Sequence, residues 1–140
     1  MSIIIMILLL SFLVLVHEAG HFLAARMFKI KVSKFGFGLP IGPTLWSKQI
    51  GDVEVLIHAF LLGGYVSFPD DEKDSKLPAD SEDRFINRPV WQRMVVISAG
   101  VIANIITAFF LVFITSLVWG KLPSENYQVY VNKIAAEKGA

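Results

Sequence analysis

Two long apolar stretches limit what this chain can fold into. Ile3–Ala25 and Met94–Trp119 each exceed the roughly 20 residues that a helix needs to cross the hydrocarbon layer of a bilayer. The second stretch contains no charged residue, and 54% of the whole chain is hydrophobic, which is high for a soluble domain. These stretches predict two transmembrane helices.

The first stretch is predicted to be a retained helix and not a secretory signal. It has no basic residue before it, and its apolar run continues through Phe22–Ala25, beyond the usual length of a signal sequence. Basic residues follow it at once and mark the cytoplasmic end of a span; they are Arg26, Lys29, Lys31 and Lys34. We therefore expect the N-terminus outside, residues 29–93 in the cytoplasm and the second helix running outward again.

The region between the helices changes character after residue 29. It is rich in glycine and carries short extended runs at 32–37, 53–57 and 65–68, which predict two or three short strands joined by glycine turns. Two placements remain open for this small sheet. It could dip as a β-hairpin beside the first helix, where protein or a wet cavity satisfies its backbone, or it could lie flat on the membrane surface.

The remaining segments are predicted from composition. Pro69–Asp83 is acidic and indicates a solvated linker, and Arg84–Arg93 mixes apolar and basic residues as an interfacial segment does. After Pro123 a short strand is expected at 127–131. The predicted organisation is a first helix at 1–28, β-loops at 29–68, a linker at 69–84, an interfacial segment at 85–93, a second helix at 94–120 and an extracytoplasmic segment at 121–140.

Charge and cysteine content exclude several functions. The formal net charge is +1 and the basic residues are scattered, so nothing indicates nucleic-acid binding. Cysteine is absent, which excludes disulfides and thiolate metal sites.

His17, Glu18 and His21 form an H-E-x-x-H motif near the C-terminal end of the first apolar stretch. On a helix the two histidines lie one turn apart on the same face, and both imidazoles can reach one metal ion. Glu18 lies about 100° round the helix, where it can address a water molecule at that site. A hydrogen-bonded core cluster is the alternative, but three polar groups at membrane depth favour a zinc site.

Small residues recur along the second apolar stretch. Gly100, Asn104 and Ala108 follow one another at i, i+4 and i+8, and Gly20 and Ala24 offer a matching small face on the first helix. Asn104 is the one strongly polar side chain of this stretch. It is predicted either to hydrogen-bond between helices or to donate to a substrate carbonyl or developing oxyanion.

Several motifs, in this order, resemble the site-2 protease family of intramembrane zinc metalloproteases, in its bacterial type with PDZ domains. They are His17-Glu18-Ala19-Gly20-His21, Phe35-Gly36-Phe37-Gly38, Leu62-Gly63-Gly64-Tyr65-Val66, Asn87-Arg88-Pro89-Val90-Trp91-Gln92-Arg93 and Ala99-Gly100-Val101-Ile102-Ala103-Asn104. The resemblance covers nearly the whole chain, and it implies a multi-pass protein of the bacterial inner membrane whose residues 121–140 begin a soluble, β-containing PDZ domain.

The resemblance also implies roles for individual residues. His17 and His21 would bind Zn²⁺, Glu18 would be the general base, and the β-loops with Gly63, Gly64 and Tyr65 would hold substrate beside Asn104. The family's third zinc ligand is an aspartate in a later transmembrane helix, and no such motif follows residue 104 here. The resemblance therefore covers the N-terminal half of such an enzyme, with the C-terminal half as the partner that supplies the ligand.

The implied substrates are single-span membrane proteins, cut in regulated intramembrane proteolysis. Two other functions remain open: a scaffold or pseudoprotease that binds membrane helices without cutting them, and a metal carrier or sensor in the membrane. His58 has no place in the family's pattern, and we interpret it as a core or interfacial histidine and not as a ligand.

Overall fold

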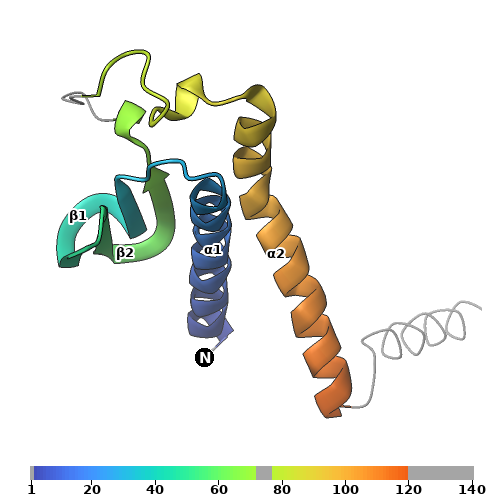
Figure 1. Cartoon of the computed structure of the whole chain (residues 1–140). Coiled ribbons are helices and arrows are strands. Elements are labelled where there is room, and N and C mark those ends of the chain that lie inside the picture. The colour runs from blue at the N-terminus through green and yellow to red at the C-terminus, as the bar shows by residue number, and fades with distance from the viewer. Residues whose placement is uncertain (1, 72–76, 120–140) are drawn as a thin grey trace, which may run out of the picture. The chain divides into compact units, whose positions relative to one another are not determined.

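The computed structural model describes residues 2–71 and 77–119 (Figure 1). The elements in chain order are α1 (Ser2–Met27), β1 (Lys34–Ile50), β2 (Val53–Ser67), the short 3-10 helices η1 (Pro69–Asp71) and η2 (Phe85–Asn87), and α2 (Val90–Trp119). The chain divides into two compact units, Met1–Ile105 and Ile106–Ala140, and the first unit holds the sheet, α1 and the start of α2. The predicted strand at 127–131 and the expected start of a PDZ domain at 121–140 lie outside the described residues.

Both apolar stretches are helices, as the sequence predicts, and both are long and apolar enough to cross a membrane. Their apolar side chains remain exposed along most of their length; Ile4 is 64% exposed on α1 and Ile97 is 63% exposed on α2. Exposure of this kind is what a lipid environment covers. α2 begins at Val90 and not at Met94, because the backbone amides of Gln92 and Arg93 donate to the carbonyl of Pro89 and start the helix there.

α1 ends in a tight backbone turn. The amide of Ile30 donates to the carbonyl of Ala25 at 2.9 Å, and the amide of Lys29 donates to the carbonyl of Arg26 at 3.0 Å. This is the Schellman arrangement, and Lys29 occupies its left-handed position with a φ of 53°. Ile30 and Ala25 are both buried, which supplies the apolar contact that accompanies this motif.

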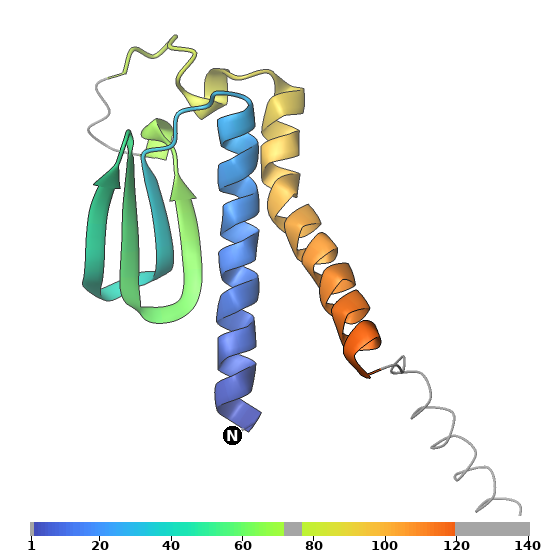
Figure 2. The same ribbon diagram turned by 60° about the horizontal axis from the view of Figure 1, so that its bottom comes forward.

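β1 and β2 are two long strands joined by a two-residue turn at Gly51 and Asp52. The sequence predicts shorter pieces, but each strand is continuous and bends, so that its two halves have different neighbours. Segment 34–37 pairs antiparallel with 64–67 on one side and runs alongside 54–57 in the same direction on the other, while 46–50 pairs with 53–57. The sheet therefore has four segments side by side (Figure 2), and 64–67 forms one of its edges.

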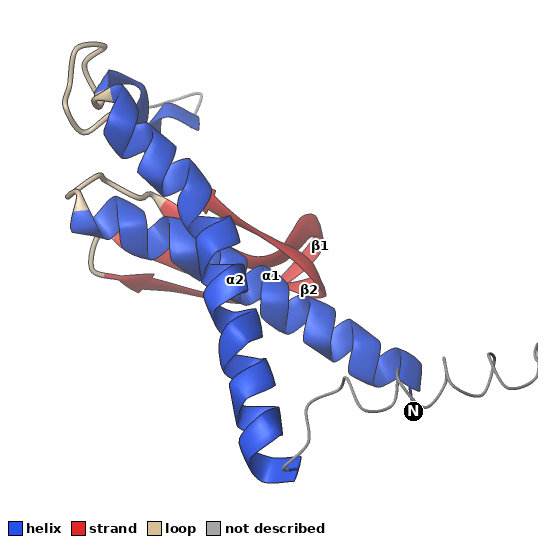
Figure 3. Cartoon of the chain, turned by 90° about the vertical axis from the view of Figure 1, so that its right-hand side faces the viewer, coloured by secondary structure: helices blue, strands red, loops and turns tan. Residues whose placement is uncertain are grey.

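α1 lies between the sheet and the N-terminal half of α2 (Figures 1 and 3). The rings of Phe22 on α1 and Phe35 on β1 pack edge to face at 5.4 Å between centroids. A small core closes the end where α1 finishes and joins α1, the sheet and α2; its buried members are Ala24, Ala25, Ile30, Val32, Val53 and Val96. The sheet thus lies along the side of α1, as a hairpin beside the first helix would.

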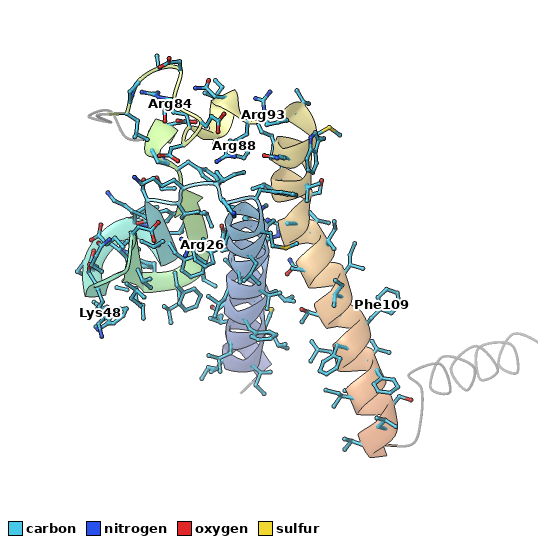
Figure 4. All side chains as sticks on the ribbon, in the orientation of Figure 1. Arg26, Lys48, Arg84, Arg88, Arg93 and Phe109 are labelled. Atoms are coloured by element: carbon cyan, nitrogen blue, oxygen red, sulfur yellow. The ribbon has the colours of Figure 1, made fainter. Side chains whose placement is uncertain are left out.

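The connection from the sheet to α2 carries several local contacts where the structure describes it, and much of the predicted solvated linker at 77–83 is exposed. Arg84 donates to the backbone carbonyls of Leu77 and Pro78, and the Phe68 and Phe85 rings stack at 4.5 Å. Arg88 donates to the carbonyl of Lys29 at 2.9 Å, so the entry to α2 is tied to the exit of α1. Figure 4 shows Arg84, Arg88 and Arg93 gathered at this end of the fold.

Lys29→Val tests the turn that ends α1. A β-branched residue in the left-handed region is strained, so this substitution should lower the free energy of unfolding by about 1–2 kcal/mol. Lys31→Val, at an exposed position without a positive φ, removes the same charge and should change stability by less than about 0.5 kcal/mol. Thermal unfolding of both variants in detergent micelles measures the difference, and equal losses would contradict the assigned strain.

Candidate metal centre

His17 and His21 direct their imidazole rings toward each other from successive turns of α1. Their Nε2 atoms are 3.1 Å apart, and the rings meet edge to face with centroids at 4.7 Å. Two nitrogens that each lie 2.0–2.1 Å from one tetrahedral zinc ion are separated by about 3.3 Å. The spacing of the two nitrogens therefore suits a single metal ion with almost no rearrangement.

α2 supplies the groups that orient these rings. His21 Nδ1 lies 2.7 Å from the carbonyl oxygen of Val96, and because that oxygen can only accept, Nδ1 carries the proton and donates. The tautomer that results leaves a lone pair on His21 Nε2, the atom that faces His17. A backbone carbonyl on the far nitrogen is the usual support of a metal-binding histidine.

Asn104 approaches the corresponding nitrogen of His17. Its side-chain amide nitrogen lies 3.4 Å from His17 Nδ1, while its Oδ1 is buried without a hydrogen-bond partner. Turning the amide by 180° would bring Oδ1 to His17 Nδ1, satisfy the buried oxygen and place the proton on Nδ1. His17 Nε2 would then also carry a lone pair. The unpartnered oxygen thus fits a metal-binding state of His17 better than a hydrogen bond between the two histidines.

Gly100 leaves open the place where the two rings converge. A Cβ atom on this residue would lie 2.5 Å from His21 Nε2 and 2.7 Å from His17 Nε2, inside van der Waals contact of both. Gly20 produces the close approach from the other helix, because a Cβ there would lie 2.5 Å from the backbone oxygen of Ala99. The pairing of small faces predicted from the sequence is confirmed at Gly20 and Gly100.

Glu18 points away from this pair and toward β2. A Cβ atom on Gly64 would lie 2.7 Å from Glu18 Cγ and 3.5 Å from a methyl group of Val14. Glu18 and His21 border a cavity of about 200 Å³, whose other walls come from β2, the connecting segment and α2. The carboxylate and one imidazole therefore share a space large enough for several water molecules.

The structure separates the sequence-predicted substrate residues into two groups. Gly64 lies against Glu18 and Asn104 lies against His17. Gly63 instead contacts Leu39, and Tyr65 stacks on His58, so both side-chain positions face away from Glu18. The role of Val96, and that of Gly100 beside the imidazoles, were not predicted from the sequence. The spacing of 96, 100 and 104 could have indicated both, because it places Val96 and Gly100 on one face of α2 together with Asn104.

The described residues do not provide a complete metal site. Within residues 2–71 and 77–119, no group of three or more histidine, aspartate or glutamate side chains could hold one metal ion. Two imidazoles are therefore the ligand set that this part of the chain supplies, whereas catalytic zinc sites use three protein ligands.

Comparison with known proteins decides the family. Residues 5–138 match the family model described as peptidase family M50. The chain belongs to peptidase family M50. This is the site-2 protease family, so the resemblance drawn from the sequence motifs is confirmed.

Curated relatives of this M50 chain carry similar descriptions. It is 50% identical over 111 residues to a "putative zinc metalloprotease" of Nostoc sp., covering 79% of this chain and 30% of that protein. It is 46% identical over 111 residues to the membrane metalloprotease ARASP of Arabidopsis thaliana, covering 79% of this chain and 24% of that protein. The M50 chain therefore spans about a quarter to a third of the length of these relatives.

Gly100→Ala tests the metal centre of this M50 chain. The new methyl group would overlap both Nε2 atoms, so the complete encoded protein with this change should retain far less zinc than the unchanged protein. Alanine favours helix more than glycine does, so α2 itself should remain intact. Val101→Ala, on the exposed neighbouring position, is the control and should keep zinc at the wild-type level. Metal analysis per chain after dialysis measures both, and unchanged zinc in Gly100→Ala would place the metal elsewhere.

Proposed function

We propose that this chain forms the active-site part of a membrane-embedded zinc endopeptidase that cuts the membrane-spanning segments of other proteins. Family membership supports the peptidase class, and the two apolar helices support the membrane setting. The observation that carries the proposal is the convergence of the two Nε2 atoms at Gly100, with Glu18 bordering the same cavity as His21. The proposed ligands are His17 and His21, and the proposed cofactor is Zn²⁺.

The roles of the chain's own groups follow from their positions. Bound zinc would lower the pKa of a water molecule and polarise the scissile carbonyl. Glu18, beside the cavity, would accept the proton of the attacking water and pass it to the departing amide nitrogen. Val96 and Asn104 would hold the imidazoles in the tautomer that binds the metal.

Substrate would be held along the edge segment 64–67. In the described sheet this segment pairs with 34–37 on one side only, so its other side offers unpaired backbone groups. An extended peptide added to such an edge gains main-chain hydrogen bonds and becomes accessible to hydrolysis. Because Gly64 touches Glu18, a strand bound there would pass close to the proposed base.

The membrane placement follows from the sheet's position along α1. Gly64 on the hairpin approaches Val14 of α1. From Val14 to the end of α1 at Met27 the helix is about 20 Å long, at 1.5 Å per residue. If the basic end of α1 marks the cytoplasmic surface, the hairpin reaches well into the bilayer from that side. Exposed apolar side chains at its tip suit this depth; they include Ile41, Leu45, Phe60 and Leu62.

A further segment of the protein is proposed to supply the third zinc ligand, as the family resemblance implies. A non-catalytic protein that binds membrane helices is the second candidate, favoured by the incomplete ligand set among the described residues. Zinc content of the complete encoded protein separates the two. About one tightly bound ion per chain supports the peptidase, and absence of zinc supports the non-catalytic function.

Glu18→Gln tests the proposed base. The amide keeps the size of the side chain but cannot accept a proton, so cleavage of a single-span model substrate should fall by at least about a hundredfold. Bound zinc should remain at the wild-type level, since Glu18 points away from the two nitrogens. The complete encoded protein in lipid vesicles is the material for this assay. Wild-type cleavage by the variant would refute the proposed function.

Gly64→Ala tests the contact between the sheet edge and Glu18. The added methyl group would lie 2.7 Å from Glu18 Cγ and displace the carboxylate, so cleavage should fall by about tenfold or more. Gly42→Ala is the matched control, because its methyl group meets only the Phe60 ring, at 3.3 Å. Equal activity of the two variants in the same vesicle assay would show that Glu18 does not depend on Gly64.

A further inference from the structure

His58, on β2, is a buried titratable residue that the proposed chemistry does not use. It is 4% exposed, and both of its ring nitrogens have partners. Its Nδ1 lies 3.3 Å from Thr44 Oγ1, and its Nε2 lies 3.2 Å from the phenol oxygen of Tyr65. The His58 and Tyr65 rings also stack, with centroids 5.9 Å apart.

These three side chains form a bridge across the sheet. Thr44 and His58 are paired between β1 and β2, whereas Tyr65 belongs to the edge segment 64–67, which pairs with 34–37. The bridge therefore crosses over segment 34–37 to reach the edge. It joins Thr44 and His58 to the edge segment 64–67, with which neither residue is paired in the sheet register.

Two glycines on β1 make room for this bridge. A Cβ atom on Gly36 would overlap the Tyr65 ring, and a Cβ atom on Gly38 would lie 3.1 Å from His58 Cβ. Gly38 also has a φ of 94°, a conformation that side chains rarely adopt. The glycines of the Phe35-Gly36-Phe37-Gly38 run thus serve the packing of His58 and Tyr65 on the face of the sheet turned away from Glu18.

We infer that His58 is a positioning residue: through its hydrogen bonds to Thr44 and Tyr65 it holds the edge segment 64–67 in the position at which substrate would be bound. This inference deepens the proposed function and rests on it. Tyr65 directly follows Gly64, which touches Glu18, so a shift of Tyr65 changes the approach of the edge to the proposed base.

The protonation states of the bridge agree with this role. A neutral imidazole has one donor and one acceptor nitrogen, and each hydroxyl can do either, so all three groups can be satisfied together. Burial raises the pKa of the Tyr65 phenol, which keeps its proton available for the bridge. The buried His58 imidazole therefore has a hydroxyl partner on each side, one from the half-buried Tyr65 and one from the exposed Thr44.

Tyr65→Phe and His58→Phe, alone and combined, test the inference in the complete encoded protein in lipid vesicles. The probe is a single-span model substrate with a fluorescent label at one end. Tyr65→Phe removes one oxygen atom and should not unfold the protein. Each single variant should raise KM about tenfold, because the edge loses its fixed position, while kcat stays within about twofold. The double variant should be no worse than His58→Phe, because both changes break the same bridge.

Ser47→Ala is the matched control. Ser47 donates to Glu54 at 2.9 Å on the same sheet but does not reach the edge segment, so its loss should leave KM unchanged. A fall in kcat with KM unchanged would indicate loss of folded enzyme and would overturn the positioning role. Additive effects of the two variants, or no effect of either, would overturn it as well.

Glu18→Gln in the same assay distinguishes failure of the proposed function from failure of the role assigned to His58. If that variant cleaves normally, the proposed function fails. If it is inactive while His58→Phe and Tyr65→Phe behave as wild type, only the role of His58 fails.

Discussion

The close approach of α1 and α2 is the constraint on which the rest of the site depends. Gly20 allows α1 to reach the backbone of Ala99, and Gly100 leaves open the space that the two imidazoles enter. At this separation the Val96 carbonyl accepts a hydrogen bond from His21 Nδ1. A larger side chain at either glycine would push the helices apart, remove that acceptor and leave a partly buried imidazole without a partner, which costs more than the lost contact itself.

The sheet solves a second physical problem, which is how extended backbone can lie beside an apolar helix. Isolated strands beside such a helix would leave amides and carbonyls without partners. Because β1 and β2 bend and pair in four segments, the two central segments, 34–37 and 54–57, have partners on both sides, and the edge segment 64–67 keeps one open side near Glu18. That open side is where the proposed function would add the substrate strand.

Much of this arrangement could be predicted from the sequence, and the misses have physical causes. Length and apolar content predict the two helices, and the i, i+4 spacing predicts that His17 and His21 share a face. The sheet register was not predictable in this way, because segment 34–37 has two partners that are distant in sequence. It runs parallel to one of them, 54–57, and antiparallel to the other, 64–67. In the sequence, Gly100 is one of a stripe of small residues, and helix packing alone explains such a stripe. Only the structure shows its second role, which is to leave space for both imidazoles.

The two faces of the sheet make different contacts. The face toward α1 brings Val66 to the cavity that Glu18 and His21 border, and it brings Gly64 so close to Glu18 that a side chain at position 64 would displace the carboxylate. The opposite face carries the bridge from Thr44 through the buried His58 to Tyr65. A strand alternates its side chains between two faces, so successive residues 64 and 65 meet both demands at once. Glycine thus stands where the proposed base approaches the sheet, and an aromatic hydroxyl stands where His58 is proposed to hold the edge.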